Sequence, residues 1–203
     1  MITTSAYDAT ATEFNVLTSL RSVEATAFLE RFISLVPTGG VVGDAGCGPG
    51  HELALFAQHG LRAVGVDLSI GLLRIASPRG PVVAADLGTL PVRDASLDAI
   101  WCGAALLHID RHHLGGVVRE WRRALSLNGV VGLATSLGGD EGWELSPTAA
   151  ARDLAIPGVH RRWFVHHHHD DVIAAIEAAG LTIVEASTRY AGRDWLYLLA
   201  VTR

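Results

Sequence analysis

Apolar and polar positions along this chain follow a helical period in some segments and form short apolar runs in others. Ala25, Phe28, Phe32 and Val36 recur at helical spacing and would form one buried face. This spacing, together with capping residues, predicts helices over residues 22–36, 51–57, 68–76, 110–125 and 170–179. The short apolar runs predict strands over residues 41–44, 61–67, 81–86, 96–102, 130–135, 181–186 and 195–202.

The alternation of strand and helix predicts an α/β fold with a mostly parallel seven-stranded sheet and helices on both faces. Only a turn over residues 188–194 separates the last two strands, so the last strand should run antiparallel. A chain of 203 residues suits one domain. We expect it to comprise an N-terminal helical cap (1–36), a core (37–135), a substrate loop region where the periodicity fails (136–168), and a C-terminal helix with two strands (169–203).

The charge balance disfavours nucleic acid as a partner. The sequence has 16 basic residues, all of them arginine, against 21 acidic residues, whereas binding to phosphates requires concentrated cationic side chains. The two cysteines, Cys47 and Cys102, do not require a disulfide, and a reducing compartment fits them best. No signal-like segment or membrane-length apolar run is visible. We therefore expect a soluble cytoplasmic protein, either a monomer or a homodimer.

The chain after Asp44 has the sequence of a strand that breaks into a glycine-rich turn before a helix. Gly46, Gly48 and Gly50 allow the backbone to turn sharply and to approach a ligand without an intervening Cβ. Such a strand–turn–helix unit holds a small anionic or polar ligand. His51 replaces the third glycine of a dinucleotide motif, and Asp44 would repel a diphosphate, so a dinucleotide is disfavoured.

Asp44 followed by Gly-x-Gly-x-Gly resembles the first motif of the class I S-adenosylmethionine-dependent methyltransferases, although the turn alone also suits other doubly wound proteins. The resemblance implies a Rossmann-like methyltransferase fold, with S-adenosyl-L-methionine as cofactor and S-adenosyl-L-homocysteine as product. It implies that the turn wraps the methionine part of the cofactor while Asp44 holds the ammonium through the local network. The cofactor-binding residues implied are Tyr7, Asp44, Gly46, Cys47, Gly48, Gly50, Asp67, Leu68, Asp86, Leu87 and Cys102.

Two further acids stand at strand ends, where ligands collect in an open α/β sheet. Asp67 ends the second predicted strand, 23 residues after Asp44, and a carboxylate there can accept two hydrogen bonds from a vicinal diol. The resemblance assigns Asp67 to the ribose hydroxyls. It assigns Asp86 and Leu87, at the end of the third strand, to the adenine amino group and ring. A single strand-end Asp is commonly a cap, but three in register after a matching turn point to a ligand.

Tyr7 and His108 each admit two interpretations. Tyr7 stands where small-molecule members of the family carry an aromatic residue over the cofactor, and core packing explains it equally well. His108 follows the fourth strand and is our candidate general base, because a hydroxyl nucleophile must lose a proton. A capping or packing histidine is the alternative. The sulfonium itself needs no activating base, so the protein must mainly align the nucleophile and exclude water.

Candidate substrate residues follow the fifth strand. Trp143 offers a flat face and Glu141 a charge, although a solvated loop explains both. Arg162 can orient an acidic or carbonyl group, or form an exposed ion pair. Four consecutive histidines over 166–169 cannot all bind one ion because adjacent side chains diverge, so we expect no metal. One or two of them, His166 first, are expected to face the substrate.

These observations predict a methyltransferase acting on a small molecule. The fourth strand is not followed by the Asn/Asp-Pro-Pro-Tyr signature that the resemblance associates with amino-methylating DNA and protein enzymes. A hydroxyl oxygen is our favoured acceptor over nitrogen or carbon. A methyltransferase-fold enzyme that uses its cavity for cyclisation or rearrangement is the second hypothesis. A cofactor-binding regulator without catalysis is the third.

Overall fold

The computed structural model describes residues 2–145 and 161–203 of the chain. Its main sheet has the strand order β3-β2-β1-β4-β5-β9-β8, and β9 is the strand that runs antiparallel to its neighbours. The predicted fold class is therefore confirmed, including the antiparallel last strand.

The seven strands of this sheet are β1 Val41–Ala45, β2 Arg62–Asp67, β3 Val82–Ala84, β4 Leu97–Gly103, β5 Leu125–Ser136, β8 Leu181–Tyr190 and β9 Asp194–Thr202. The described helices are α1 Ile2–Ala9, α2 Ala11–Leu17, α3 Val23–Leu35, α4 His51–Gln58, α5 Ile70–Ala76, α6 Leu114–Ala124 and α8 His169–Ala178, with short 3-10 turns η1 Leu106–His108 and η2 Arg111–His113. A separate antiparallel ribbon consists of β6 Glu141–Leu145 and β7 Arg161–Val165.

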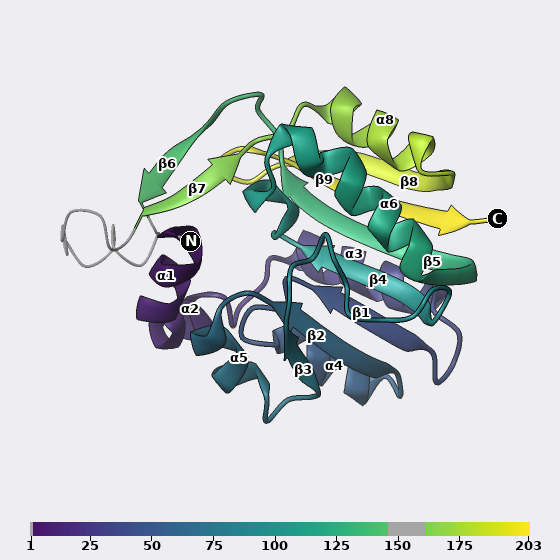
Figure 1. Cartoon of the computed structure of the whole chain (residues 1–203), viewed down its shortest axis with the longest axis horizontal. Coiled ribbons are helices and arrows are strands. Elements are labelled where there is room, and N and C mark those ends of the chain that lie inside the picture. Colours follow the sequence, from purple (N-terminus) through teal and green to yellow (C-terminus); the bar gives the residue numbers. More distant parts are fainter. Residues whose placement is uncertain (1, 146–160) are drawn as a thin grey trace.

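Helices cover both faces of the main sheet (Figure 1). α3 and α4 enclose one core, in which the rings of Phe32, Phe56 and Trp101 pack together. α6 and α8 enclose the other core around the fully buried Trp121. The predicted start of α3 is confirmed, because the side chain of Ser22 accepts a hydrogen bond from the amide of Ala25.

The N-terminal helices and the ribbon lie together at one end of the sheet. Figure 1 shows β6 and β7 projecting from the sheet toward α1. The backbone amide of Trp163 in β7 donates a hydrogen bond to Thr3 Oγ1 in α1, at 2.9 Å. These segments therefore stand over the carboxyl ends of the parallel strands.

Three expectations from the sequence need correction. The stretch after β5 is not wholly irregular, because β6 and β7 pair in register. The strand predicted over residues 130–135 begins earlier, since β5 starts at Leu125 and includes Asn128 at φ +61°, beside an irregularity in the pairing with β4. The helix predicted over residues 170–179 begins at His169 with His168 as its N-cap, so Asp170 and Asp171 lie in its first turn, where they complement the helix dipole.

The part of the chain from 146 to 160 lies outside the described residues, and with it the middle of the substrate loop region. Within the described ranges, we find no helix with the length and apolar character needed to span a bilayer.

Candidate functional site

A cavity of about 1130 Å³ opens at the carboxyl ends of the parallel strands. Its wall is built from the turn after β1, the ends of β2 and β4, the N-terminal helices, and the ribbon. Its volume exceeds the usual range of roughly 300–1,000 Å³ for one drug-sized ligand, so it can hold two molecules side by side.

The glycine turn has the backbone shape that its sequence predicts. Gly46, Gly48 and Gly50 have φ values of +81°, +51° and +79°, a region that side chains other than glycine rarely adopt. A Cβ on Gly46 would lie 2.1 Å from the Cβ of Ala105, so there is no room for one. Gly46 and Gly48 line the cavity together with Cys47, whereas Gly50 is buried as the N-cap of α4.

Asp67 and Asp86 line the cavity from the ends of β2 and β3, next to Leu68 and Leu87. The Asp67 carboxylate accepts hydrogen bonds from the amides of Gly48 and Ser69, at 2.9 and 2.8 Å. A carboxylate has about four acceptor positions, so two remain for a ligand. Burial raises the pKa of Asp67, while these amide hydrogen bonds act to lower it.

Asp44 is 1% exposed, and its Oδ2 has no hydrogen-bond partner among the described residues. Burial raises its pKa well above the usual value, and repulsion from Glu52 and Asp67 adds to this effect. Glu52 lines the cavity and pairs with Arg21 at 2.5 Å. A cationic ligand group near these acids would relieve the repulsion between them.

Tyr7 and His108 form a hydrogen-bonded pair on the cavity wall. His108 Nδ1 lies 2.6 Å from the carbonyl oxygen of Trp163, which can only accept, so Nδ1 carries the proton. The remaining nitrogen, Nε2, therefore accepts the hydroxyl proton of Tyr7 at 2.8 Å. Burial lowers the pKa of His108 to about 4 and raises the pKa of Tyr7. At neutral pH both side chains are uncharged.

The ribbon brings two tryptophans to the cavity. Trp143 and Trp163 are directly opposed across β6 and β7, their ring centroids lie 5.4 Å apart, and both line the wall. The two indoles meet edge to face, at an interplanar angle of 69°, and an aromatic or apolar ligand against them would exclude water.

Besides Gly50 and the buried Asp44, four other candidate residues do not line the cavity. Arg162 is 4% exposed, with its guanidinium 4.6 Å from the ring centre of Tyr7. His166 is buried, where it hydrogen bonds to Ser136 Oγ at 2.7 Å. Glu141 is exposed, 3.6 Å from Arg111.

Cys102 is the fourth of these residues and is fully buried in the core of the sheet. Arg162, His166 and Cys102 therefore lie behind the residues that a ligand would touch.

Sequence reasoning missed the aromatic residues that the sheet itself contributes. Trp101, Trp195 and Tyr197 line the cavity, so that four of the five tryptophans of the sequence belong to its wall. Because β9 is antiparallel, its first residues lie beside the last residues of β5, at the same edge as the ligand turn. The aromatic residues at the start of the last predicted strand were the available signal.

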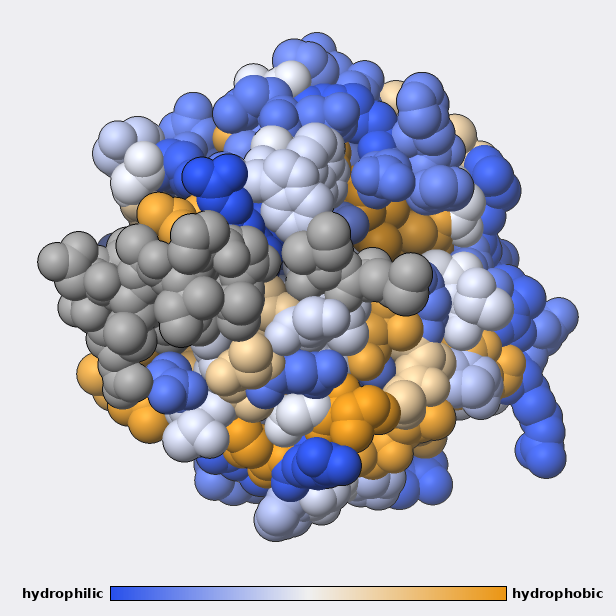
Figure 2. Space-filling model, turned by 60° about the vertical axis from the view of Figure 1, so that its left-hand side comes forward, coloured by the Kyte–Doolittle hydropathy of each residue, from blue (hydrophilic) through white to orange (hydrophobic). Residues whose placement is uncertain are grey.

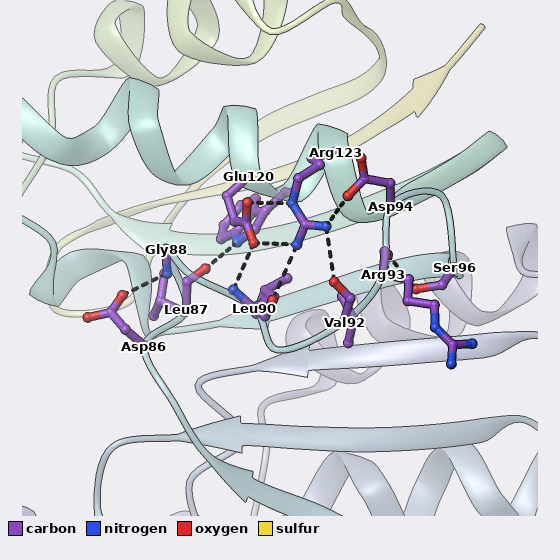
Figure 3. A network of polar contacts seen from close by, with 11 residues as sticks. Asp86, Leu87, Gly88, Leu90, Val92, Arg93, Asp94, Ser96, Glu120 and Arg123 are labelled. Atoms are coloured by element: carbon purple, nitrogen blue, oxygen red, sulfur yellow. Dashed lines mark hydrogen bonds and ion pairs between the residues drawn. The ribbon is translucent and has the colours of Figure 1, made fainter.

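The segment that joins β3 to β4, residues 86–96, is held by a polar network (Figure 3), and we call this segment the strap. The Arg123 guanidinium bonds to Glu120 Oε1 at 2.6 Å, to Asp94 Oδ1 at 2.5 Å, and to the carbonyls of Leu90 and Val92. The same Glu120 oxygen accepts the amide of Leu90 at 2.8 Å. The strap is thereby tied to α6.

The cavity mouth is largely apolar on the side that the N-terminal helices form. Leu17, Leu20 and Leu68 line the cavity yet are 51%, 88% and 52% exposed. Figure 2, with this side turned forward, shows apolar surface gathered in the lower half and hydrophilic surface above. Exposed leucines at a cavity rim suit an apolar ligand or a contact surface.

The geometry of this site accords with the comparison with known proteins. The model of a family described as "Methyltransferase domain" matches residues 43–133. The Malonyl-[acyl-carrier protein] O-methyltransferase of Dechloromonas aromatica (strain RCB) is 35% identical over 145 residues, which cover 70% of this chain and 52% of that protein. The chain spans about half the length of the curated relatives it matches.

Two solved structures are similar in fold. The 1,6-didemethyltoxoflavin-N1-methyltransferase of Burkholderia thailandensis, with bound 1,6-didemethyltoxoflavin and S-adenosylhomocysteine, has a TM-score of 0.75 at 18% identity, covering 99% of this chain and 87% of that one. The [4+2]-cyclase SpnF has a TM-score of 0.68 at 18% identity, covering 88% and 80% of the two chains. At these identities the likeness concerns the fold.

Proposed function

We propose that this chain, which belongs to the class I S-adenosylmethionine-dependent methyltransferases, transfers the methyl group of S-adenosyl-L-methionine to a hydroxyl oxygen of a small molecule. One observation carries the proposal: a single cavity joins the strand-end carboxylates Asp67 and Asp86 to the Tyr7–His108 pair. The acceptor site and the cofactor site thus share one wall.

The residues at the strand ends fit the cofactor. Two acceptor positions on Asp67 remain for the ribose hydroxyls, and Asp86 lies exposed beside Leu87 for the adenine. The glycine turn leaves room for the methionine part, whose ammonium suits the cluster of acids around the turn, where the buried Asp44 Oδ2 has no hydrogen-bond partner among the described residues. When bound, the cofactor supplies a methyl group on a sulfonium, which is already electrophilic.

The Tyr7–His108 pair provides a path for the acceptor's proton. The Tyr7 oxygen donates its proton toward His108 Nε2 and can accept one from an acceptor hydroxyl. An acceptor hydroxyl beside Tyr7 would give its proton to the Tyr7 oxygen while the Tyr7 proton moves to His108 Nε2, and His108 would then release it, because burial lowers the pKa of His108 to about 4. The carbonyl of Trp163 keeps His108 in the tautomer that this transfer requires.

A hydroxyl acceptor accounts for this pair better than a carboxylate acceptor does. The Dechloromonas relative is named an O-methyltransferase, and the Burkholderia neighbour an N1-methyltransferase, so the family name alone leaves the acceptor atom open. A carboxylate has no proton to lose at neutral pH and needs no base. A proton-accepting pair beside the cofactor therefore favours a hydroxyl.

The cyclase SpnF makes cyclisation the competing function, because it has the same fold. Methyl transfer consumes one cofactor per product, whereas cyclisation consumes none. Demethylated cofactor that accumulates in step with product supports our proposal, and product without it supports cyclisation.

Calorimetry with S-adenosyl-L-methionine and S-adenosyl-L-homocysteine tests the cofactor site. Replacement of Asp67 with Ala should weaken both by about 1–3 kcal/mol, the scale of hydrogen bonds to a charged acceptor. Asp171→Ala, an exposed acid in the first turn of α8 that does not line the cavity, is the matched control and should leave cofactor affinity nearly unchanged. The proposal fails if neither compound binds at millimolar concentration.

A screen of phenols, carboxylic acids and amines for demethylated cofactor then identifies the acceptor atom.

A further inference from the structure

The sheet forms an aromatic trench at one end of the cavity. Gly103 of β4 pairs with Ala134 of β5, and Ala134 pairs with Tyr197 of β9, so the three share one face. Trp101 and Trp195 precede Gly103 and Tyr197 by two residues and therefore lie on the same face. All five residues line the cavity, with Gly103 and Ala134 as a small-residue floor between the aromatic walls. We call these five residues the trench.

The walls of the trench are held in place from behind. The ring of Trp101 lies 5.1 Å from that of Phe32, and the ring of Tyr197 lies 5.1 Å from that of Phe28, both on α3. Rings fixed by such packing keep their orientation before a ligand arrives, which reduces the entropy lost on binding.

The indole N–H of Trp101 is a donor with no acceptor. Trp101 is 4% exposed, and within the described residues its Nε1 has no hydrogen-bond partner. A buried donor left unpaired is destabilising, so natural structures seldom keep one without a reason. A Cβ on Gly103 would lie 2.8 Å from this Nε1, so the N–H edge of the indole lies over the trench floor, at a position where only glycine leaves it room.

The charges around the cavity disfavour an anion. Among the described lining residues Arg21 is the one arginine, and Glu52 already neutralises it at 2.5 Å. Three further carboxylates, Asp67, Asp86 and Asp110, line the same wall. An acidic ligand would therefore meet more carboxylates than guanidinium groups on this wall, because Arg162 lies behind it, 4.6 Å from the ring centre of Tyr7.

We propose that the acceptor is an uncharged planar molecule whose ring lies among Trp101, Trp195 and Tyr197 and whose carbonyl or hydroxyl oxygen accepts the Trp101 N–H. This deepens the function proposed above and rests on it. Flat indole and phenol faces bind a planar ring, and the unpaired N–H of Trp101 selects a ring that carries an acceptor oxygen. Hydroxylated aromatic ketones and related oxygenated aromatics form the substrate class.

The test compares three naphthalenes by calorimetry, with S-adenosyl-L-homocysteine present. They are 2-acetylnaphthalene, which carries a carbonyl, 2-ethylnaphthalene, which does not, and the anion 2-naphthoate. We expect the wild-type protein to bind the ketone about fivefold more tightly than the ethyl compound, the value of one net hydrogen bond. It should bind the anion more weakly than the ketone.

The variant Trp101→Phe keeps the ring and removes the donor. The preference for the ketone should fall to near unity in this variant, while the ethyl compound reports any change in shape. Trp121→Phe is the matched control, because the Trp121 N–H already donates a hydrogen bond to the Leu87 carbonyl at 3.0 Å. This variant should keep the wild-type preference for the ketone over the ethyl compound. A preference that survives Trp101→Phe, or that Trp121→Phe also abolishes, overturns the proposal. So does equal binding of the two neutral probes, or tighter binding of the anion.

These outcomes are separable from failure of methyl transfer. The same titrations without cofactor still report the trench if S-adenosyl-L-homocysteine does not bind. A protein that binds the cofactor but shows no preference for the ketone keeps its methyltransferase function and loses the acceptor assignment.

Discussion

At the scale of single residues, the direction of each hydrogen bond at His108 decides its role. Its Nδ1 proton is committed to the Trp163 carbonyl and its Nε2 lone pair to the Tyr7 hydroxyl. In the reaction that we propose, the acceptor would meet the Tyr7 oxygen first, and His108 would act through it. The sequence presented Tyr7 as a cover for the cofactor and His108 as a base, whereas the geometry joins them in one unit.

The variants His108→Ala and Tyr7→Phe should each lower the rate of methyl transfer by about a hundredfold or more, because each interrupts the same proton path. The double variant should be little slower than either single variant, since residues that act as a unit are not additive. Single-turnover kinetics measure the rates, and calorimetry should show cofactor affinity little changed.

His112→Ala removes an exposed histidine of the next turn and serves as the control. If His108→Ala turns over near the wild-type rate while the control is also normal, His108 is a packing residue. Proton removal then belongs elsewhere.

The pH dependence of stability offers a second test of His108. Its folded pKa of about 4 lies below the ordinary value of 6.5, so between these pH values the folded state binds fewer protons than the unfolded state. Its contribution to stability is thus fully present above pH 6.5 and is lost as the pH falls toward 4. The raised pKa values of Asp44 and Asp67 act in the opposite direction. The comparison must therefore be made against a variant that lacks only His108.

Between pH 7.5 and pH 5, wild-type protein should lose about 2 kcal/mol more unfolding free energy than His108→Gln. Urea unfolding at the two pH values measures this difference. Equal losses in the two proteins would show that the His108 ring is hydrated and titrates normally.

The positions of the strand-end acids could be predicted because they depend on local sequence. An apolar run fixes where a strand ends, and Asp67 and Asp86 follow such runs directly. Trp101 could not be assigned, since whether its N–H is paired depends on residues distant in the chain. The same holds for Arg162, whose place among the rings of Tyr7 and Phe14 is set by α1, α2 and β7 together.

At the scale of elements, periodic segments were predictable and the ribbon was not. α3 and α6 each bury one continuous face, so spacing alone revealed them. β6 alternates between exposed and half-buried positions without a run of apolar residues, and of its residues only Trp143 lines the cavity. Asn128 and Gly129 favour a turn in isolation, so the sequence does not predict that β5 already starts, with a bulge, before them.

The strap between β3 and β4 is an element held by side chains rather than by regular structure. We expect Arg123→Met to release it, because one guanidinium joins two acids and two carbonyls (Figure 3). The network is partly exposed, so the loss of unfolding free energy should be about 1–2 kcal/mol. Cofactor affinity should fall severalfold, since Asp86 and Leu87 begin the strap.

Arg122→Met is the matched control, a neighbouring arginine outside this network. Thermal melting and cofactor titration of the two variants measure both effects. If Arg123→Met is destabilised but binds the cofactor normally, the strap does not contribute to binding of the adenine.

At the scale of the whole molecule, the cavity lies between a rigid sheet and segments of low intrinsic stability. α1 has 8 residues and α2 has 7, too short to persist as isolated helices. The ribbon is two-stranded and marginal by itself. Each depends on the other, as the Thr3–Trp163 hydrogen bond shows, and the ligand would lie against both.

Cofactor binding should therefore slow amide exchange in α1, α2 and the ribbon more than in β8 and α8, which lie away from the cavity. A ligand that binds only the closed state adds about 2.7 kcal/mol at a concentration of one hundred times its Kd. Local openings of the cavity wall should become rarer by up to about a hundredfold. Hydrogen–deuterium exchange with and without S-adenosyl-L-homocysteine measures this. Asp67→Ala at the same ligand concentration is the control and should show less protection. Uniform protection across the sheet would mean that the cap and ribbon are already closed without ligand.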